Sequence, residues 1–255
     1  MRVDEVARLW DANADRWAED VRAGFDVFRD AYNNPAFFAF VGPVAGLAVL
    51  DAGCGEGTNT RLFARGGARI VGVDLSPAMI ARARATEHEE PLGIRYEVGS
   101  FTELAGIEAA AYDLVVSTMA LMDSPDLDAA LAAFLRVLRP GGRLCFSVTH
   151  PCFTNAALGF GEEDGVSFLR VRAYAIDGPV VETWKFGAAP EGTPPFRIAY
   201  FPRTIATLVQ AVLGAGFRLD GLVEPCPTEE ACREHPRLAR YRTIPHFLYL
   251  GARKP

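Results

Sequence analysis

The stretch Val49-Leu-Asp-Ala-Gly-Cys-Gly-Glu-Gly57 decides the fold, because an apolar run ends there in an acid, Asp51, and in three glycines separated by single residues. Glycine lets the backbone pass close to a ligand where a Cβ would collide with it, at the edge of a sheet where helix N-termini point. A second acid, Asp74, ends the next apolar run at 69–73. A carboxylate at that place can accept hydrogen bonds from both hydroxyls of a ribose. The two segments together predict a nucleoside-binding loop between a strand and a helix.

The glycine spacing separates this loop from two other nucleotide-binding loops. A dinucleotide fingerprint reads G-x-G-x-x-G, and Thr58 stands where its third glycine belongs. The triphosphate-binding pattern G-x-x-x-x-G-K-[ST] does not occur in the sequence. We therefore expect a ligand without a phosphate chain, and a nicotinamide-dependent oxidoreductase is disfavoured.

Strand-like and helix-like patterns alternate through the middle of the chain. The strand candidates, which are mostly apolar, are 47–50, 69–73, 94–98, 112–117 and 144–148. Apolar residues at helical spacing lie between them, most clearly at 130–138. Strands that are apolar on both faces and separated by helices predict an α/β fold whose parallel sheet is covered on both sides.

The rhythm changes after Pro151. Residues 153–200 are rich in glycine and proline, and we expect a hairpin there between 168–176 and 180–186 around the turn 177–179. Patterns of helix and strand then resume at 204–213, 217–223 and 246–252. The segment 153–200 is therefore interpreted as an insertion into one domain.

Composition excludes several classes of protein. Half of the 255 residues are apolar and 23% are charged, which is typical of a folded globular chain. The net charge of −6 disfavours nucleic acid and anionic membranes as partners. One basic cluster departs from this balance, and it fits a solvated face better than a site for an anionic substrate: Arg233, His235, Arg237, Arg240 and Arg242.

The N-terminal residues, the shortness of the uncharged stretches and the cysteine pattern suggest a cytoplasmic protein without a metal site. Asp4 and Glu5 stand where a signal peptide needs basic residues, and the longest uncharged stretch, 36–50, is too short to cross a bilayer. Five cysteines without a C-x-x-C pair suggest neither a disulfide framework nor a zinc site.

Five ordered motifs resemble those of the class I S-adenosylmethionine-dependent methyltransferases. They are VLDAGCGEG (49–57), IVGVDLSPAMI (70–80), VGSF (98–101), YDLVVS (112–117) and LRPGGRL (138–144). The resemblance implies a Rossmann-like, doubly wound, mostly parallel seven-stranded sheet with an antiparallel last strand, and S-adenosyl-L-methionine as cofactor. N-terminal helices and a β-rich insertion would form a cap.

The resemblance also divides one domain, 1–255, into parts. Residues 45–150 would be the cofactor-binding core, and 201–255 would complete the sheet. The N-terminal helices, 1–40, would form a lid and 153–200 a substrate cap, because family members vary in these two segments.

Cofactor contacts are carried over from the motifs. The backbone of the glycine loop would hold the methionine part, with Asp51 near its amino group, while Asp74 would hold the ribose. The full implied set is Asp51, Gly53, Cys54, Gly55, Gly57, Asp74, Leu75, Met79, Ser100, Phe101 and Ser117, with Trp17 as a further candidate at the methionine end. The family usually has aspartate where this chain has Ser100. Simpler roles compete with some of these assignments: helix caps for the two acids and core packing for Met79.

Two histidines are candidates for a general base, although a sulfonium methyl is already activated and a base is optional. His150 follows the fifth predicted strand, at the edge where ligands bind. His246 begins the last strand, and it returns to the same edge if that strand is antiparallel. The alternative for His150 is a local role at the strand end.

Tyr32 and Arg203 are candidates for closing the substrate pocket, with aromatic packing and a helix start as their alternatives. The predicted function is methyl transfer to an O, N or C atom of a small-molecule acceptor. The alternative is an S-adenosylmethionine-binding protein that transfers no methyl group or uses the sulfonium for another reaction. We expect a monomer or a homodimer.

Overall fold

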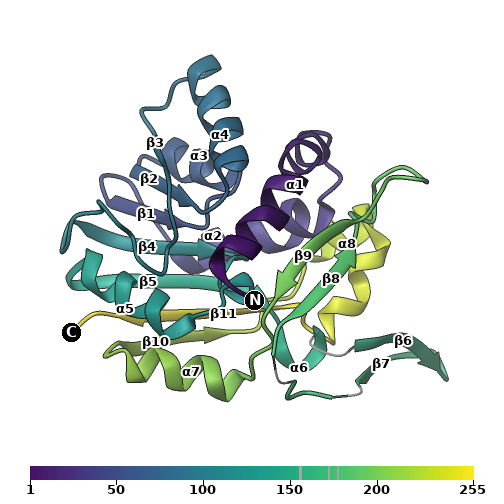
Figure 1. Cartoon of the computed structure of the whole chain (residues 1–255). Coiled ribbons are helices and arrows are strands. Elements are labelled where there is room, and N and C mark those ends of the chain that lie inside the picture. The colour runs from purple at the N-terminus through teal and green to yellow at the C-terminus, as the bar shows by residue number, and fades with distance from the viewer. Residues whose placement is uncertain (155–156, 172, 177) are drawn as a thin grey trace.

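A seven-stranded sheet forms the centre of the computed structural model, which describes residues 1–154, 157–171, 173–176 and 178–255 (Figure 1). The strand order is β10-β11-β5-β4-β1-β2-β3. The strands are β1 (Ala48–Ala52), β2 (Arg69–Asp74), β3 (Arg95–Val98), β4 (Tyr112–Thr118), β5 (Leu138–Thr149), β10 (Arg218–Val223) and β11 (Phe247–Arg253).

Strand directions agree with the predicted topology. The pairs β1–β2, β1–β4, β2–β3 and β4–β5 are parallel. The last strand, β11, is inserted between β5 and β10 and runs antiparallel to both. The carboxyl ends of β1, β4 and β5 therefore meet the amino end of β11 at one edge of the sheet.

Helices cover both faces of the sheet. They are α1 (Val3–Arg22), α2 (Asn34–Val41), α3 (Thr58–Arg65), α4 (Pro77–Glu89), α5 (Leu127–Val137), α6 (Pro151–Thr154), α7 (Ile205–Gly214) and α8 (Glu229–Glu234), with a π-helical turn at Arg29–Asn33. Successive side chains of β1 enter different cores: Leu50 packs with Phe134 of α5, whereas Val49 packs with Phe63 of α3. The doubly wound α/β fold predicted from the sequence is confirmed.

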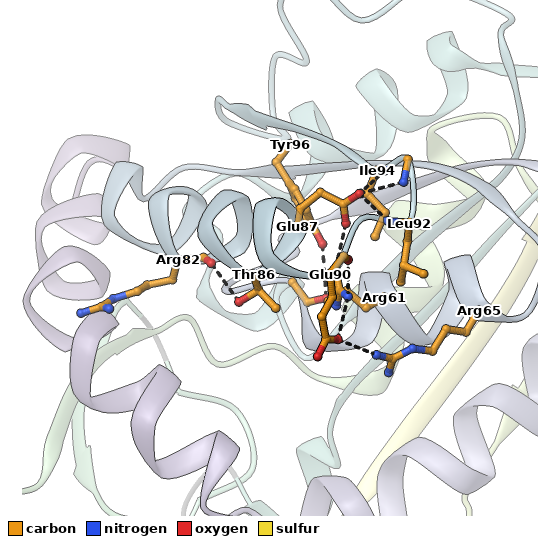
Figure 2. Close-up of polar contacts among 11 residues, drawn as sticks. Arg61, Arg65, Arg82, Thr86, Glu87, Glu90, Leu92, Ile94 and Tyr96 are labelled. Carbon is orange, nitrogen blue, oxygen red and sulfur yellow. Dashed lines mark hydrogen bonds and ion pairs between the residues drawn. The ribbon is translucent and has the colours of Figure 1, made fainter.

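Ion pairs far from the sheet edge fix the two helices that flank the glycine loop. Figure 2 shows Arg61 of α3, whose guanidinium pairs with Glu87 of α4 at 2.8 Å and donates to the carbonyl of Glu90 at 2.7 Å. The other carboxylate oxygen of Glu87 accepts hydrogen bonds from the backbone N–H groups of 92–94. Because Arg61 is only 5% exposed, we expect this network to hold α3 and α4 rigidly together.

The insertion contains two hairpins, and neither pairs 168–176 with 180–186, so the prediction of that hairpin is wrong. Strand β6 (Ala157–Glu163) pairs with β7 (Val166–Val171), and β8 (Val180–Trp184) pairs with β9 (Phe196–Tyr200). Asp164 and Gly165 both have positive φ, at 49° and 74°, so the first hairpin turns at an Asp-Gly pair that matches the twist of its strands. Asp177, in the turn expected from the sequence, lies outside the described residues.

The N-terminal helix and the second hairpin form a roof over the sheet edge. An aromatic cluster joins them, in which Trp17 of α1 lies 5.8 Å from Trp184 and 5.1 Å from Phe196 between ring centroids. The side-chain amide of Asn13 also donates to the carbonyl of Arg197 at 2.9 Å. Segments far apart in sequence are thereby locked together, as α1, β8 and β9 lie side by side in Figure 1.

Within the described residues, none of the helices is long and apolar enough to cross a membrane.

Candidate active site

A cavity of about 930 Å³ lies between the carboxyl edge of the sheet and the roof. Its floor includes Gly53, Gly55 and Thr118, and its roof includes Trp17 and Trp184. Nine of the candidate cofactor residues lie in its wall: eight from the sequence motifs, Asp51, Gly53, Cys54, Gly55, Leu75, Met79, Ser100 and Phe101, and the further candidate Trp17. The cavity thus brings together residues that lie between Trp17 and Phe101 in the sequence.

The glycine loop is fixed from behind and open in front. The backbone N–H groups of Gly53 and Cys54 both donate to the carbonyl of Val73, at 2.8 and 3.1 Å. Gly53 has a φ of 83°, and a Cβ added there would collide with the Cβ of Ala120. A Cβ at Gly55, in contrast, would meet no atom within 4 Å, because that position faces the cavity. The loop therefore presents backbone atoms at Gly55, without a side chain, to a ligand in the cavity.

Asp74 braces this loop just behind the wall. It is 8% exposed, and its two carboxylate oxygens accept hydrogen bonds from the backbone N–H groups of Gly55 at 2.8 Å and Ser76 at 2.9 Å. Burial raises its pKa from 3.8 to about 6. Leu75 also hydrogen-bonds the carboxylate through its backbone N–H, but a carboxylate has about four acceptor sites, so Asp74 can still accept a hydrogen bond from a ribose.

Two further residues of the implied cofactor set support the wall without belonging to it. The hydroxyl of Ser117 donates to the carbonyl of Ala52 at 2.8 Å and so ties β4 to β1. A Cβ at Gly57 would lie 2.5 Å from the hydroxyl of Tyr96. Tight packing of α3 against β3, more than ligand contact, explains glycine at this position.

Asp51 is the most deeply buried acid of the loop. It is 1% exposed, and the Thr60 hydroxyl donates to it at 2.7 Å. Burial raises its pKa from 3.8 to about 7, and the nearby Asp74 and Glu56 act in the same direction. Because the folded chain binds this proton more tightly than the unfolded chain, the free energy of unfolding falls as pH rises from about 4 to about 7.

Asp51→Asn is therefore expected to stabilise the ligand-free protein at pH 8, by roughly 1–3 kcal/mol, because it removes a buried charge. The gain should shrink at pH 5, where Asp51 is already protonated. Urea unfolding at both pH values measures this, with the exposed Glu191→Gln as control. An Asp51→Asn effect that is the same at both pH values would contradict the assignment.

Ser100 points its hydroxyl toward Thr102, 2.7 Å away, and accepts a hydrogen bond from the Thr102 backbone N–H at 3.2 Å. Ser100, Phe101 and Thr102 all line the cavity. The segment after β3 therefore presents the hydroxyls of Ser100 and Thr102 and the ring of Phe101 at the place where the sequence motif usually has an aspartate.

The structure separates the two histidine candidates. His150 is 1% exposed; its Nε2 lies 2.8 Å from Glu224 and its Nδ1 accepts from the Cys152 N–H at 3.2 Å, so the ring is fully engaged outside the cavity wall. His246 lines the cavity, between the rings of Phe28 and Tyr241. Burial lowers the pKa of His246 from 6.5 to about 4, so its imidazole is neutral at pH 7.

Neither pocket-closing candidate lies in the cavity wall. The hydroxyl of Tyr32, which is 1% exposed, donates to the carbonyl of Pro225 at 2.6 Å. The guanidinium of Arg203 donates to the carbonyls of Leu121 and Ser124 at 3.1 and 2.5 Å. Both side chains brace elements behind the wall, because their polar ends are used on backbone carbonyls of distant segments.

Sequence reasoning missed several wall residues, chiefly Asp123, Glu182 and Tyr200. Asp123 and Glu182 are acids with raised pKa values, and burial is the main cause for both. An acid six residues beyond Ser117 was a usable signal for Asp123, since loops after β4 reach the ligand edge. Glu182 had no such signal, because its place depends on how the insertion folds back.

Comparisons with known proteins agree on one family. A family model described as a methyltransferase domain matches residues 50–146. The ubiquinone biosynthesis O-methyltransferase of Xanthomonas oryzae pv. oryzae (strain PXO99A) is 35% identical over 119 residues, which are 46% of this chain and 50% of that protein. The chain therefore matches about half the length of the curated relatives.

Solved structures extend the likeness to the rest of the chain. An S-adenosylmethionine-dependent methyltransferase from Mesorhizobium loti is 29% identical, with a TM-score of 0.74 over 89% of this chain and 100% of that one. The 1,6-didemethyltoxoflavin-N1-methyltransferase of Burkholderia thailandensis, solved with S-adenosylhomocysteine, is 21% identical with a TM-score of 0.56, over 100% of this chain and 91% of that one. At that identity, the second likeness concerns the fold alone.

Proposed function

Because the chain belongs to the class I S-adenosylmethionine-dependent methyltransferase family, we propose that it transfers a methyl group from S-adenosyl-L-methionine to a small-molecule acceptor. The observation that carries this proposal is a cavity of about 930 Å³, which extends from the glycine loop to the aromatic roof. Small-molecule sites have volumes of about 300–1,000 Å³. The cavity has room for a nucleoside cofactor and for a modest acceptor beside it.

The residues present fit the cofactor. Gly55 is open toward the cavity, so the methionine part would lie against bare backbone, with the Asp51 carboxylate available to its amino group. Asp74 would receive the ribose, and Leu75 and Met79 offer an apolar surface to the adenine. The loop has no lysine and no third fingerprint glycine for a phosphate chain, which agrees with a nucleoside that has none.

S-adenosylmethionine would supply, when bound, a methyl group on positively charged sulfur: an in-line acceptor would bond to the methyl carbon while the carbon–sulfur bond breaks and S-adenosylhomocysteine leaves. The chain's own contribution is to hold the acceptor in line and to exclude water. The cluster of Trp17, Trp184 and Phe196 closes the cavity above the sheet edge, so we propose that 1–40 and 153–200 act as the lid and cap that select the acceptor.

We propose His246 as the group that takes a proton from the acceptor, when the acceptor has one to lose. Its imidazole lines the cavity, and the described residues give neither ring nitrogen a hydrogen-bond partner. The ring is neutral at pH 7 and can accept a proton, but burial makes it a weaker base than an exposed histidine, so its position in the cavity wall carries the assignment. His150 is assigned a positioning role: its contacts to Glu224 and Cys152 hold the end of β5.

His246→Ala is expected to lower kcat by about 10²- to 10⁴-fold while leaving cofactor affinity unchanged. His150→Ala should instead lower the free energy of unfolding by about 1–3 kcal/mol, because buried partners lose their hydrogen bonds. Steady-state kinetics and urea unfolding of both variants separate the two roles. Normal turnover in His246→Ala would remove it as a base.

The function is tested by calorimetry with S-adenosylmethionine and S-adenosylhomocysteine, followed by transfer of a labelled methyl group to a panel of small O, N and C nucleophiles. We expect both cofactor forms to bind and at least one acceptor to take up label. If neither form binds, the proposal is wrong. Tight binding without transfer to any acceptor favours a binding protein of this fold.

A further inference from the structure

Two carboxyl groups line the part of the cavity that is formed by the β4 end and the roof. Asp123 closes the 3₁₀ turn Leu121–Asp123 that follows β4, and Glu182 lies in the middle of β8. They come from the core and from the insertion, respectively, so only the assembled roof brings them to one cavity. Tyr200, on the strand paired with β8, lines the same region.

Asp123 is buried and incompletely paired. Its side chain is 6% exposed, and Oδ1 has no hydrogen-bond partner among the described residues. The buried hydroxyl of Thr118, five residues earlier on the same wall, is equally without a partner in the described part of the chain. Orphaned buried polar atoms are costly, so their occurrence together in a cavity wall points to a ligand that satisfies them.

The turn that carries Asp123 is fixed from behind. Arg203 donates to the carbonyls of Leu121 and Ser124, which flank Asp123 on either side. The guanidinium is therefore used on the backbone, and its charge lowers the pKa of Asp123 less than burial raises it. Arg203 thus acts as a positioning residue that holds the carboxyl group toward the cavity.

The charge balance of this region is negative. Burial raises the pKa of Asp123 well above its ordinary value, Glu182 and Asp74 raise it further, and Trp10 and Arg203 lower it. Burial alone raises the pKa of Glu182. Lys185 also lines the cavity, but its Nζ lies 3.4 Å from the carbonyl of Pro190 in an exposed contact. A cation brought by a ligand would stabilise both carboxylates.

Aromatic rings surround the same region. Glu182 and Trp184 share one face of β8, since alternate residues of a strand point the same way. Trp10 and Trp17 complete the wall on the side of α1, 5.1 Å apart between centroids. Indole faces attract cations, and they also pack well on flat apolar groups.

We propose that Asp123 and Glu182 form the acceptor subsite and bind a protonated amine carried on an aromatic or other apolar body. The inference rests on the proposed function and narrows it to one chemical class of acceptor. The amine is the recognised group, and methylation can occur on it after deprotonation or on another atom of the same molecule. Acids and neutral alcohols of the same shape are expected to bind less tightly, because they offer no positive charge to the two carboxylates.

The test uses the full chain saturated with S-adenosylhomocysteine, whose binding is measured first. Failure at this stage defeats the proposed function, and failure in the next stage defeats only the inference. Three probes share an indole ring and differ at the end of the side chain: tryptamine has an ammonium group, tryptophol a hydroxyl and indole-3-propionate a carboxylate. We expect calorimetry to show tryptamine binding about tenfold or more tightly than the other two.

Variants then assign the preference to the two carboxyl groups. Asp123→Asn should weaken tryptamine binding by about ten- to a hundredfold and leave tryptophol binding unchanged. Glu182→Gln, on the less buried strand β8, should act in the same direction and keeps the inference testable if Asp123→Asn does not fold. Asp128→Asn removes the same charge from an exposed position of α5 and should change nothing.

Three results would overturn the inference. The first is equal or reversed preference among the probes, and the second is no binding of tryptamine at millimolar concentration. The third concerns the cofactor: if Asp123→Asn weakens S-adenosylmethionine but not S-adenosylhomocysteine, Asp123 serves the sulfonium charge and not an acceptor amine.

Discussion

Replacing Gly53 by alanine is expected to remove measurable cofactor binding. Gly53 has a φ of 83°, where a side chain costs about 1–2 kcal/mol, and its new Cβ would collide with Ala120 on the loop after β4. Overpacking of this kind costs a further 1–3 kcal/mol or so. The loop must move to relieve the collision, and it then loses the backbone position held by the Val73 carbonyl. Calorimetry with S-adenosylhomocysteine should show affinity reduced by roughly a hundredfold or more.

Gly93→Ala is the matched control for this change. Gly93 has a φ of 78°, but an added Cβ would meet no atom within 4 Å, and the residue lies outside the cavity wall. We expect a small loss of stability from the backbone conformation alone and native cofactor affinity. Native affinity in Gly53→Ala, with its fold intact by circular dichroism, would show that the loop does not hold the cofactor.

Asp74→Ala is expected to weaken cofactor binding by about 1–3 kcal/mol, which corresponds to a five- to 150-fold lower affinity. The substitution removes the acceptors for the backbone N–H groups of Gly55 and Ser76, and with them the oxygens proposed for the ribose. Asp74→Asn keeps one accepting oxygen, so its cofactor affinity should lie between those of the native protein and of Asp74→Ala. Calorimetry at pH 8 is suitable because the pKa of Asp74 is about 6, so the native carboxylate is charged there.

The same variant separates two roles of Asp74. A cap and brace contributes to folding, whereas a ribose ligand contributes to affinity. If Asp74→Ala lowers the free energy of unfolding but leaves the dissociation constant unchanged, the residue only braces the loop. The exposed Asp15→Asn, at the surface of α1, controls for the loss of one negative charge.

The buried acids at the cavity lower the stability of the ligand-free protein, and the same acids are available to bind a ligand. Asp51, Asp74 and Asp123 all have raised pKa values with burial as the main cause, so each is held at a cost in the ligand-free protein. Groups kept under such conditions are typical of binding sites, because a ligand can satisfy them when the fold does not. The roof adds the aromatic surface that would exclude water once the cavity is filled.

The sequence by itself determined the doubly wound sheet, the ligand loop and the two acids on β1 and β2. These features follow from short-range patterns: the apolar runs of parallel strands, the helical spacing between them, and glycines at fixed offsets. The parallel topology then places the ends of β1, β2 and β3 at one edge, so eight of the implied cofactor residues lie in one wall. The antiparallel last strand came from the resemblance, and the structure agrees with it.

Only the tertiary structure decided which side chains enter the cavity from outside this core. The pairing of β7 with β6 and of β8 with β9 is a choice among similar short strands, and local patterns do not select the partner. His150 and His246 lie at the same edge, yet the packing of Glu224 holds one away from the wall while the other lines it. Arg203 lies far along the chain from the turn that carries Asp123, and it reaches the carbonyls of that turn only because the chain returns to the end of β4. Side-chain direction at such places is set by long-range packing, which spacing along the chain does not contain.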